Sequence, residues 1–187
     1  MYVYYILVLL RLMGNKYDKE DAYRTLELIN SWINNVDTKA SFALAFQTFL
    51  IGSCINNGLP AGIKTFIDVT PKQRTCVIWI NVIAVSIFLI ACTSASTYLL
   101  LTLVAKTRNK ARKKSVMFFG TIAAYSLNDF KAKTMNMSES ELIKDLLEQV
   151  HTNSEICMTK FQRYNMGIKI MIFEFIYGII IWLCGLI

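Results

Sequence analysis

Two long stretches of the chain contain no charged side chain. Residues 40–63 and residues 75–105 hold no Asp, Glu, Lys, Arg or His. A helix needs about 20 such residues to cross the hydrocarbon core of a bilayer, and both stretches are long enough. The pattern therefore predicts two transmembrane helices, the first over residues 40–59 and the second over residues 76–105.

A third apolar stretch, residues 167–187, contains two charged residues, Lys169 and Glu174. Lys169 lies near its start, from where a lysine can extend its ammonium group to the membrane interface. Glu174 lies five residues further along, about 7.5 Å deeper along a helix axis. A carboxylate at that depth is neutral, is paired or faces a wet cavity, so Glu174 has either a local partner or a role in lining a pore. This stretch predicts a third span.

Amphipathic segments precede the first and the third span. In residues 17–39, apolar side chains recur every three or four positions, which predicts a helix that leads into the first span. A second amphipathic helix begins at Ser138, where Glu141 completes a capping box, and continues towards the third span. Before that helix, residues 115–125 are too short to span a membrane and fit either a short strand or a buried helix. Together these segments predict a small, mainly helical module.

Basic residues are concentrated directly after the second span. Lysine and arginine in short loops mark the cytoplasmic side of a membrane. We therefore place residues 17–39 and 106–166 in the cytoplasm and residues 60–75 in an external loop. Residues 1–16 form an apolar extension that is too short to span. The residues that determine this topology are Lys106, Arg108, Lys110, Arg112, Lys113 and Lys114.

The composition supports a membrane protein and offers no catalytic chemistry. Of 187 residues, 18% are charged, against about a quarter in soluble domains, and the net charge is +7. The five cysteines lack metal-ligand spacing, so we expect them to be free. The chain has one histidine and no hydrolase, nucleotide-loop or zinc-protease motif. We predict an all-α membrane protein with two or three transmembrane helices, which is not an enzyme and holds no metal or cofactor.

Two groups of residues are candidates for ligand binding or gating. Asp37 and Lys39 lie where the first helix enters the membrane, and Trp32 lies about two turns before Lys39. An ion pair or hydrogen bonds there would fix how the cytoplasmic helix joins its span. A nucleotide pocket in the module would need cations and aromatic faces, which the sequence offers in Phe118, Phe119, Tyr125, Phe130, Lys131, Lys133 and Arg163.

Three short segments, at residues 30–41, 119–122 and 147–160, carry a family resemblance. The first contains W-I-x-x-x-D-T-K-A-S and is the most specific, the second is F-G-T-I, and the third begins with L-E-Q-V and ends in Lys160. In this order, around two apolar spans and before a third, they resemble the membrane-spanning effectors of bacterial Pycsar antiphage systems. The matching residues are Trp32, Asp37, Lys39, Phe119, Gly120 and Gln149.

The resemblance implies an effector in the bacterial inner membrane. A neighbouring cyclase makes a cyclic pyrimidine nucleotide, cyclic UMP or cyclic CMP, on phage infection. The effector then impairs membrane integrity, and the infected cell dies. We also expect a homo-oligomer in contact with membrane lipids and with no DNA or RNA partner. The small residues 91–96 would pack the first two spans together or lie on a subunit interface.

Two other functions fit the same sequence. The chain could be a membrane anchor or interaction protein whose cytoplasmic helices dock a separate toxin or sensor. It could also be a small constitutive ion channel with Glu174 in its path. An anchor would cause no leakage, and a constitutive channel would conduct without any nucleotide.

Overall fold

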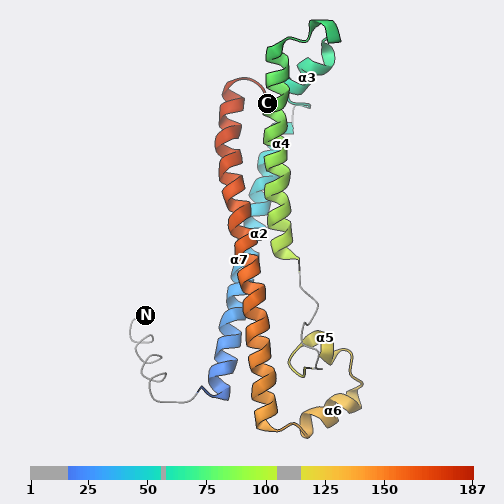
Figure 1. Ribbon diagram of the computed structural model, residues 1–187, viewed down its shortest axis with the longest axis vertical. Helices are drawn as coiled ribbons and strands as arrows, with labels where there is room; N and C mark the ends of the chain where they lie inside the picture. The colour runs from blue at the N-terminus through green and yellow to red at the C-terminus, as the bar shows by residue number, and fades with distance from the viewer. Residues whose placement is uncertain (1–16, 56–57, 105–114) are drawn as a thin grey trace, which may run out of the picture. The chain divides into compact units, whose positions relative to one another are not determined.

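The computed structural model describes residues 17–55, 58–104 and 115–187. Helices account for most of them, and no β-strand occurs in these ranges, which confirms the all-α prediction. The helices are α2 (Lys19–Ile55), α3 (Ala61–Asp68), α4 (Cys76–Leu103), α5 (Phe119–Ile122), α6 (Leu127–Met135) and α7 (Glu139–Leu183), with a short 3-10 helix at Pro71–Gln73 (Figure 1). The apolar extension at residues 1–16 and the basic cluster at residues 105–114 lie outside the described residues.

The chain divides into two compact units. The first, which we call the helical module, comprises described residues 17–34 and 115–158. The second, which we call the apolar bundle, comprises described residues 35–55, 58–104 and 159–187. Helices α2 and α7 contribute residues to both units.

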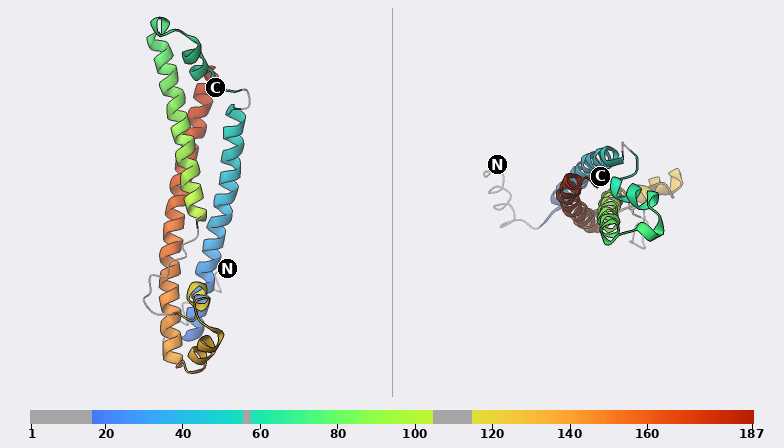
Figure 2. Two further views of the ribbon diagram at one scale, coloured as in Figure 1. Left: turned by 90° about the vertical axis from the view of Figure 1, so that its right-hand side faces the viewer. Right: turned by 90° about the horizontal axis from the view of Figure 1, so that it is seen from above.

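In the apolar bundle, α4 and the bundle parts of α2 and α7 lie side by side (Figures 1 and 2). Phe88, Cys92 and Ile181 form the buried cluster at its centre. Large apolar side chains also cover its outside, and Phe42, for example, is 73% exposed. Such an outer surface is costly in water and is suited to lipid.

Helices α4 and α7 are long and apolar enough to cross a membrane. Only 22% of the apolar window of α4 and 17% of that of α7 is buried within the structure. The core helix of a soluble protein would be mostly buried, so these values favour two helices that face lipid. Helix α2 does not reach the same apolar composition within its described length, and the span at residues 40–59 stays a prediction.

Buried positions recur every seven residues in the long helices, the spacing of coiled-coil packing. In α4 they are Val85, Cys92 and Leu99, with Phe88, Ala95 and Thr102 on the adjoining row. The corresponding positions are Ala22, Ile29, Val36, Ala40 and Gln47 in α2, and Leu146, Lys160, Gly167, Glu174 and Ile181 in α7. Four polar residues, Gln47, Thr102, Lys160 and Glu174, therefore occupy positions that are otherwise apolar.

The predicted external loop contains ordered structure. Helix α3 packs on α4, and a Cβ atom on Gly62 would lie 3.0 Å from Cγ2 of Val85. The Gly62 backbone N–H donates to the Leu186 carbonyl oxygen at 3.0 Å. Because Gly62 brings the two helices this close, the loop forms a cap on that end of the bundle.

Serine residues cap two helices in the module, and one of these caps is the capping box predicted at Ser138. The Ser126 hydroxyl accepts the Asp129 backbone N–H at 3.1 Å at the start of α6. At the start of α7, Ser138 Oγ accepts the Glu141 N–H at 3.3 Å, and Glu141 Oε2 accepts the Ser138 N–H at 3.0 Å. This is the predicted capping box. Within residues 115–125, Phe119–Ile122 form the short helix α5, so this segment contains a helix and not a strand. The helix is not buried, which differs from the expectation.

Candidate functional site

Within the apolar bundle, Lys160 of α7 joins α2 to α4. Its ammonium group donates to Asp37 Oδ1 at 2.6 Å and to the Thr102 carbonyl oxygen at 2.7 Å. The Lys160 side chain is 8% exposed, against 33% for Asp37. A buried cation is tolerated only when it is paired and hydrogen-bonded, and both conditions are met here. We call Asp37, Thr102, Lys160 and Arg163 the lysine cluster.

The lysine cluster also provides hydrogen-bond donors for carbonyl groups at the C-terminal end of α4. The last carbonyl groups of a helix have no partner within the helix, and cations interact favourably with that end. Lys160 takes the Thr102 carbonyl, and Arg163 Nη1 donates to the Leu101 carbonyl oxygen at 2.8 Å. Two basic residues of α7 therefore hold the end of α4 in place.

An ion pair or hydrogen bonds were expected at Asp37. The structure shows an ion pair there, but the sequence did not indicate its partner. Asp37 pairs with Lys160, whereas Lys39 is exposed. Trp32 is 49% exposed and belongs to the helical module. The signal for Lys160 was its position in the seven-residue pattern of α7, fourteen residues after Leu146 and fourteen before Glu174.

In the helical module, side chains of α7 hold the segment that precedes α5. Asp145 Oδ2 accepts the Val116 backbone N–H at 2.8 Å. Gln149 Nε2 donates to Ser115 Oγ at 3.2 Å, and that oxygen also accepts the Phe118 backbone N–H at 3.2 Å. Gln149, a residue of the family motif, is 4% exposed. The second and third motif segments are therefore brought together.

Gly120 is required by the ring that lies against it. A Cβ atom at this position would lie 2.6 Å from Cε1 of Phe118. The rings of Phe118 and Phe119 are 4.8 Å apart between centroids. Phe119 itself is 65% exposed, so the F-G pair places one aromatic ring against the backbone and presents the next one to solvent.

A pocket of about 360 Å³ lies beside this anchored segment in the module. Its lining combines two lysines and one tyrosine ring, which suit an anion with a planar group, with three carboxylates. Two of the acidic residues already have structural roles, since Asp145 holds Val116 and Glu141 caps α7. The lining consists of Tyr125, Lys133, Met137, Glu141, Lys144, Asp145 and Glu148.

Two of the residues that the sequence suggested for a nucleotide site line this pocket. Tyr125 and Lys133 line it, and α7 adds Lys144 and Glu148, which were not named. Phe118, Phe119, Phe130 and Lys131 are not among its lining residues. Arg163 lies in the lysine cluster of the bundle, where its partner is the Leu101 carbonyl.

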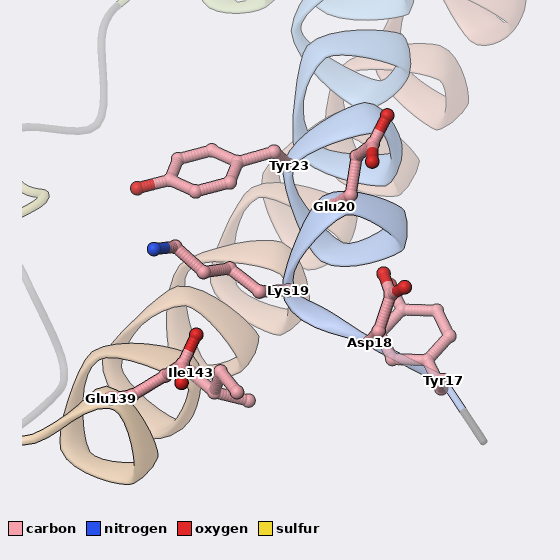
Figure 3. Close-up of a pocket in the computed structure, with 7 residues that line it drawn as sticks. All are labelled: Tyr17, Asp18, Lys19, Glu20, Tyr23, Glu139 and Ile143. Atoms are coloured by element: carbon pink, nitrogen blue, oxygen red, sulfur yellow. The ribbon is translucent and has the colours of Figure 1, made fainter.

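A larger surface groove, of about 790 Å³, lies between the starts of α2 and α7 (Figure 3). Asp18, Glu20 and Glu139 face it, with Lys19 as the single basic residue of the lining. Asp18 Oδ1 accepts the Asp21 backbone N–H at 2.9 Å, so it acts as a helix cap. The groove has three carboxylates and one ammonium group, so it is less favourable for an anionic ligand than the module pocket, which has three carboxylates and two ammonium groups.

In the middle of the apolar bundle, Glu174 pairs with Gln47. Gln47 Nε2 donates to Glu174 Oε2 at 2.6 Å, and the two residues are 0% and 1% exposed. Of the environments considered for Glu174, the structure shows a hydrogen-bonded partner. Lys169 is exposed, as expected for a lysine that extends to the interface.

All five cysteines are free, as expected. Cys157 of α7 is buried, and this burial raises the pKa of its thiol. Because the thiolate is the reactive form, Cys157 reacts slowly at neutral pH. No cluster of metal-ligating side chains occurs among the residues that the structure describes.

Comparison with known proteins identifies the family. A family model described as the Pycsar effector protein domain (PycTM) matches residues 21–187. The chain belongs to the Pycsar effector family. It is 36% identical over 177 residues to the Pycsar effector protein GmPycTM from Gulbenkiania mobilis, which covers 87% of this chain and 90% of that protein. No solved structure matches it.

A second relative is more distant. The Pycsar effector protein PtPycTM from Propioniciclava tarda is 25% identical over 160 residues, which covers 81% of this chain and 72% of that protein. Membership in the Pycsar effector family, together with two helices suited to a membrane, supports an antiphage defence effector located in a membrane. This is a non-enzymatic kind of effector in a cyclic nucleotide signalling context.

Proposed function

We propose that this Pycsar effector is activated by a cyclic pyrimidine nucleotide, cyclic UMP or cyclic CMP, and then impairs the integrity of the bacterial inner membrane. The observation that carries the proposal is the pocket lined by Tyr125, Lys133 and Lys144 in the helical module. It lies on α7, the helix that also supplies Lys160 and Glu174 to the apolar bundle.

The pocket offers chemistry that matches a cyclic nucleotide. The cyclic phosphate carries one negative charge, which the ammonium groups of Lys133 and Lys144 attract. The pyrimidine base is planar and can stack on the ring of Tyr125. Glu148 can accept a hydrogen bond from the ribose hydroxyl or from a base N–H group.

Helix α7 provides a route from the pocket to the bundle. Lys144 and Lys160 are sixteen residues apart on one helix, about 24 Å along its axis. To change a closed state populated at 99% into one at 1%, the ligand must favour the open form by about 5.5 kcal/mol. Several pockets in a homo-oligomer would supply this together, so we propose that the active form contains several copies.

Dye release from vesicles tests the proposal. Purified protein in liposomes should release a trapped dye when cyclic UMP or cyclic CMP is added. Lys133→Gln and Lys144→Gln should each raise the half-maximal nucleotide concentration about tenfold, the effect of losing one hydrogen bond to a charged group. Lys131→Gln, on the same helix as Lys133 but outside the pocket, is the matched control. Release that needs no nucleotide, or no release with either, would reject the proposal.

The structure supports the two alternative functions, a membrane anchor and a constitutive ion channel, to different degrees. Exposed apolar side chains on the module, such as Leu127 (67%) and Met135 (82%), give an anchor protein a surface for docking a partner. An anchor of this kind would cause no dye release. A constitutive channel is less well supported because Glu174 is buried and its carboxyl group is hydrogen-bonded to Gln47.

A further inference from the structure

The apolar bundle contains two buried acceptor oxygens that have no donor. They are Oε1 of Gln47 and Oε1 of Glu174. The other oxygen of Glu174, Oε2, accepts the Gln47 amide N–H. A buried acceptor without a donor destabilises the folded state, and an ionised one does so more strongly. Both belong to one hydrogen-bonded pair, so a single donor placed between the two groups would satisfy both.

The lining beside the pair offers no cationic donor. A cavity of about 170 Å³ beside Glu174 is lined mostly by apolar side chains such as Leu50, Phe88 and Phe175, with Trp182 as an uncharged N–H donor and no Lys, Arg or His among the lining residues. The titratable groups that face the carboxyl group are Cys54 of α2 and Cys92 of α4. A thiol is a weak donor. No positive charge in this lining compensates an ionised Glu174.

We propose that Glu174 is a proton-binding site within the bundle. Its Oε1 carries the proton and donates to Gln47 Oε1, while Gln47 Nε2 donates to Glu174 Oε2. The acid and the amide then form a ring with two hydrogen bonds, and neither acceptor is left unpaired. The bound proton removes the charge that the apolar surroundings penalise. It also holds α7 to α2 at the position where both helices contribute a polar side chain to the core.

A stability that depends on pH follows from this site. The proposed proton is held by the folded bundle, where it completes the hydrogen bonds of the acid–amide pair, and the unfolded chain lacks this pairing. Because the folded state then binds more protons than the unfolded state, stability falls as the pH rises. The loss is at most tenfold in the folding equilibrium constant per pH unit, since one proton is involved. The full contribution is present at low pH.

Infrared spectroscopy of the full chain in lipid bilayers tests the site directly. The wild-type protein should show the carbonyl band of a protonated carboxylic acid at pH 7, and Glu174→Gln should lack it. Gln47→Leu should keep the band but shift it to higher frequency, because the acid loses its amide partner. A wild-type spectrum with no such band at pH 7 would overturn the proposal.

Thermal denaturation in detergent provides a second readout. Glu174→Gln replaces the acid–amide pair by an amide–amide pair with the same two hydrogen bonds and no titrating proton. Its midpoint should change less between pH 6 and 9 than that of the wild type. Cys157→Ala, at a buried cysteine seventeen residues before Glu174 on α7, is the control and should retain the wild-type dependence. Equal pH dependence in wild type and Glu174→Gln would overturn the proposal. So would a midpoint that depends on sodium concentration instead of pH, because the site would then hold a cation.

Discussion

At the scale of single residues, the lysine cluster combines a buried cation with a half-buried anion. Lys160 is almost enclosed, whereas one third of the Asp37 side chain reaches solvent. Removing the two partners therefore has unequal consequences. Without Asp37, the ammonium group stays buried beside a single carbonyl oxygen. Without Lys160, the carboxylate can turn to water.

Asp37→Ala should destabilise the protein more than Lys160→Met. Leaving a buried charge without its partner costs about 3–5 kcal/mol in fully enclosed pairs, and the exposure of Asp37 reduces this to about 1–3 kcal/mol. Thermal denaturation in detergent measures the difference. Lys39→Ala, two residues away on the same helix and exposed, is the control and should change the midpoint little. An equal loss in Asp37→Ala and Lys39→Ala would show that the ion pair does not contribute.

The sequence predicted that Asp37 would take part in a polar contact, but not with which residue. Asp37 and Lys39 are close in sequence, and a local pattern favours local partners. The partner is 123 positions away and depends on the register of α7 against α2. The same applies to Gln47 and Glu174, which are 127 positions apart. Glu174 stands out in the sequence as a charged residue in an apolar stretch, and only the structure shows that its partner is Gln47.

At the scale of helices, close packing depends on small residues at the buried positions. Gly167 of α7 faces α4, where a Cβ atom would lie 3.0 Å from Cδ2 of Leu99. Gly52 of α2 has no atom within 4 Å of the corresponding point. The two glycines have the same local conformation but different surroundings, because one is at an interface between helices and the other is not.

Leucine at these two glycines should have opposite consequences. Gly167→Leu forces bulk between α7 and α4 and should cost about 1–3 kcal/mol through overpacking. Gly52→Leu meets open space and replaces a poor helix former with a good one, so it should be neutral or stabilising by up to about 1 kcal/mol. Thermal midpoints of the two variants in the same detergent measure the effect. A similar loss in both variants would contradict the packing of α7 on α4.

Helix positions were largely predictable, because caps and periodicity are local. Ser126 and Ser138 mark the starts of α6 and α7 through hydrogen bonds within three residues. The segment before α5 was ambiguous because its conformation depends on Asp145 and Gln149, which lie 29 and 34 residues further along. For the same reason, only two of the seven residues that line the module pocket were candidates from the sequence. Tyr125 and Lys133 precede α7, and their companions Lys144 and Glu148 belong to it.

At the scale of the whole molecule, the distribution of charge predicts a membrane protein and its orientation. Charge-free stretches contain α4 and most of the bundle part of α2, and the basic residues follow α4 directly. The predicted orientation places the start of α4 and the end of α7 outside the cytoplasm. An exposed cysteine lies at each of these ends, Cys76 at the start of α4 and Cys184 directly after α7. Labelling of these thiols can therefore show on which side of the membrane each end lies.

A membrane-impermeant maleimide should label this Pycsar effector from the outer side of the inner membrane. Spheroplasts expressing it should be labelled at Cys76 and Cys184, and inverted inner-membrane vesicles should not. Cys157 should stay unlabelled in both, because burial encloses its thiol and raises the pKa of that group.

The variant with both Cys76→Ser and Cys184→Ser is the control and should lose labelling in spheroplasts. Adding Lys131→Cys to it introduces an exposed thiol in the module, which should react in inverted vesicles alone. The reverse pattern would place the module outside the cytoplasm, where no nucleotide made in the cytoplasm would reach its pocket.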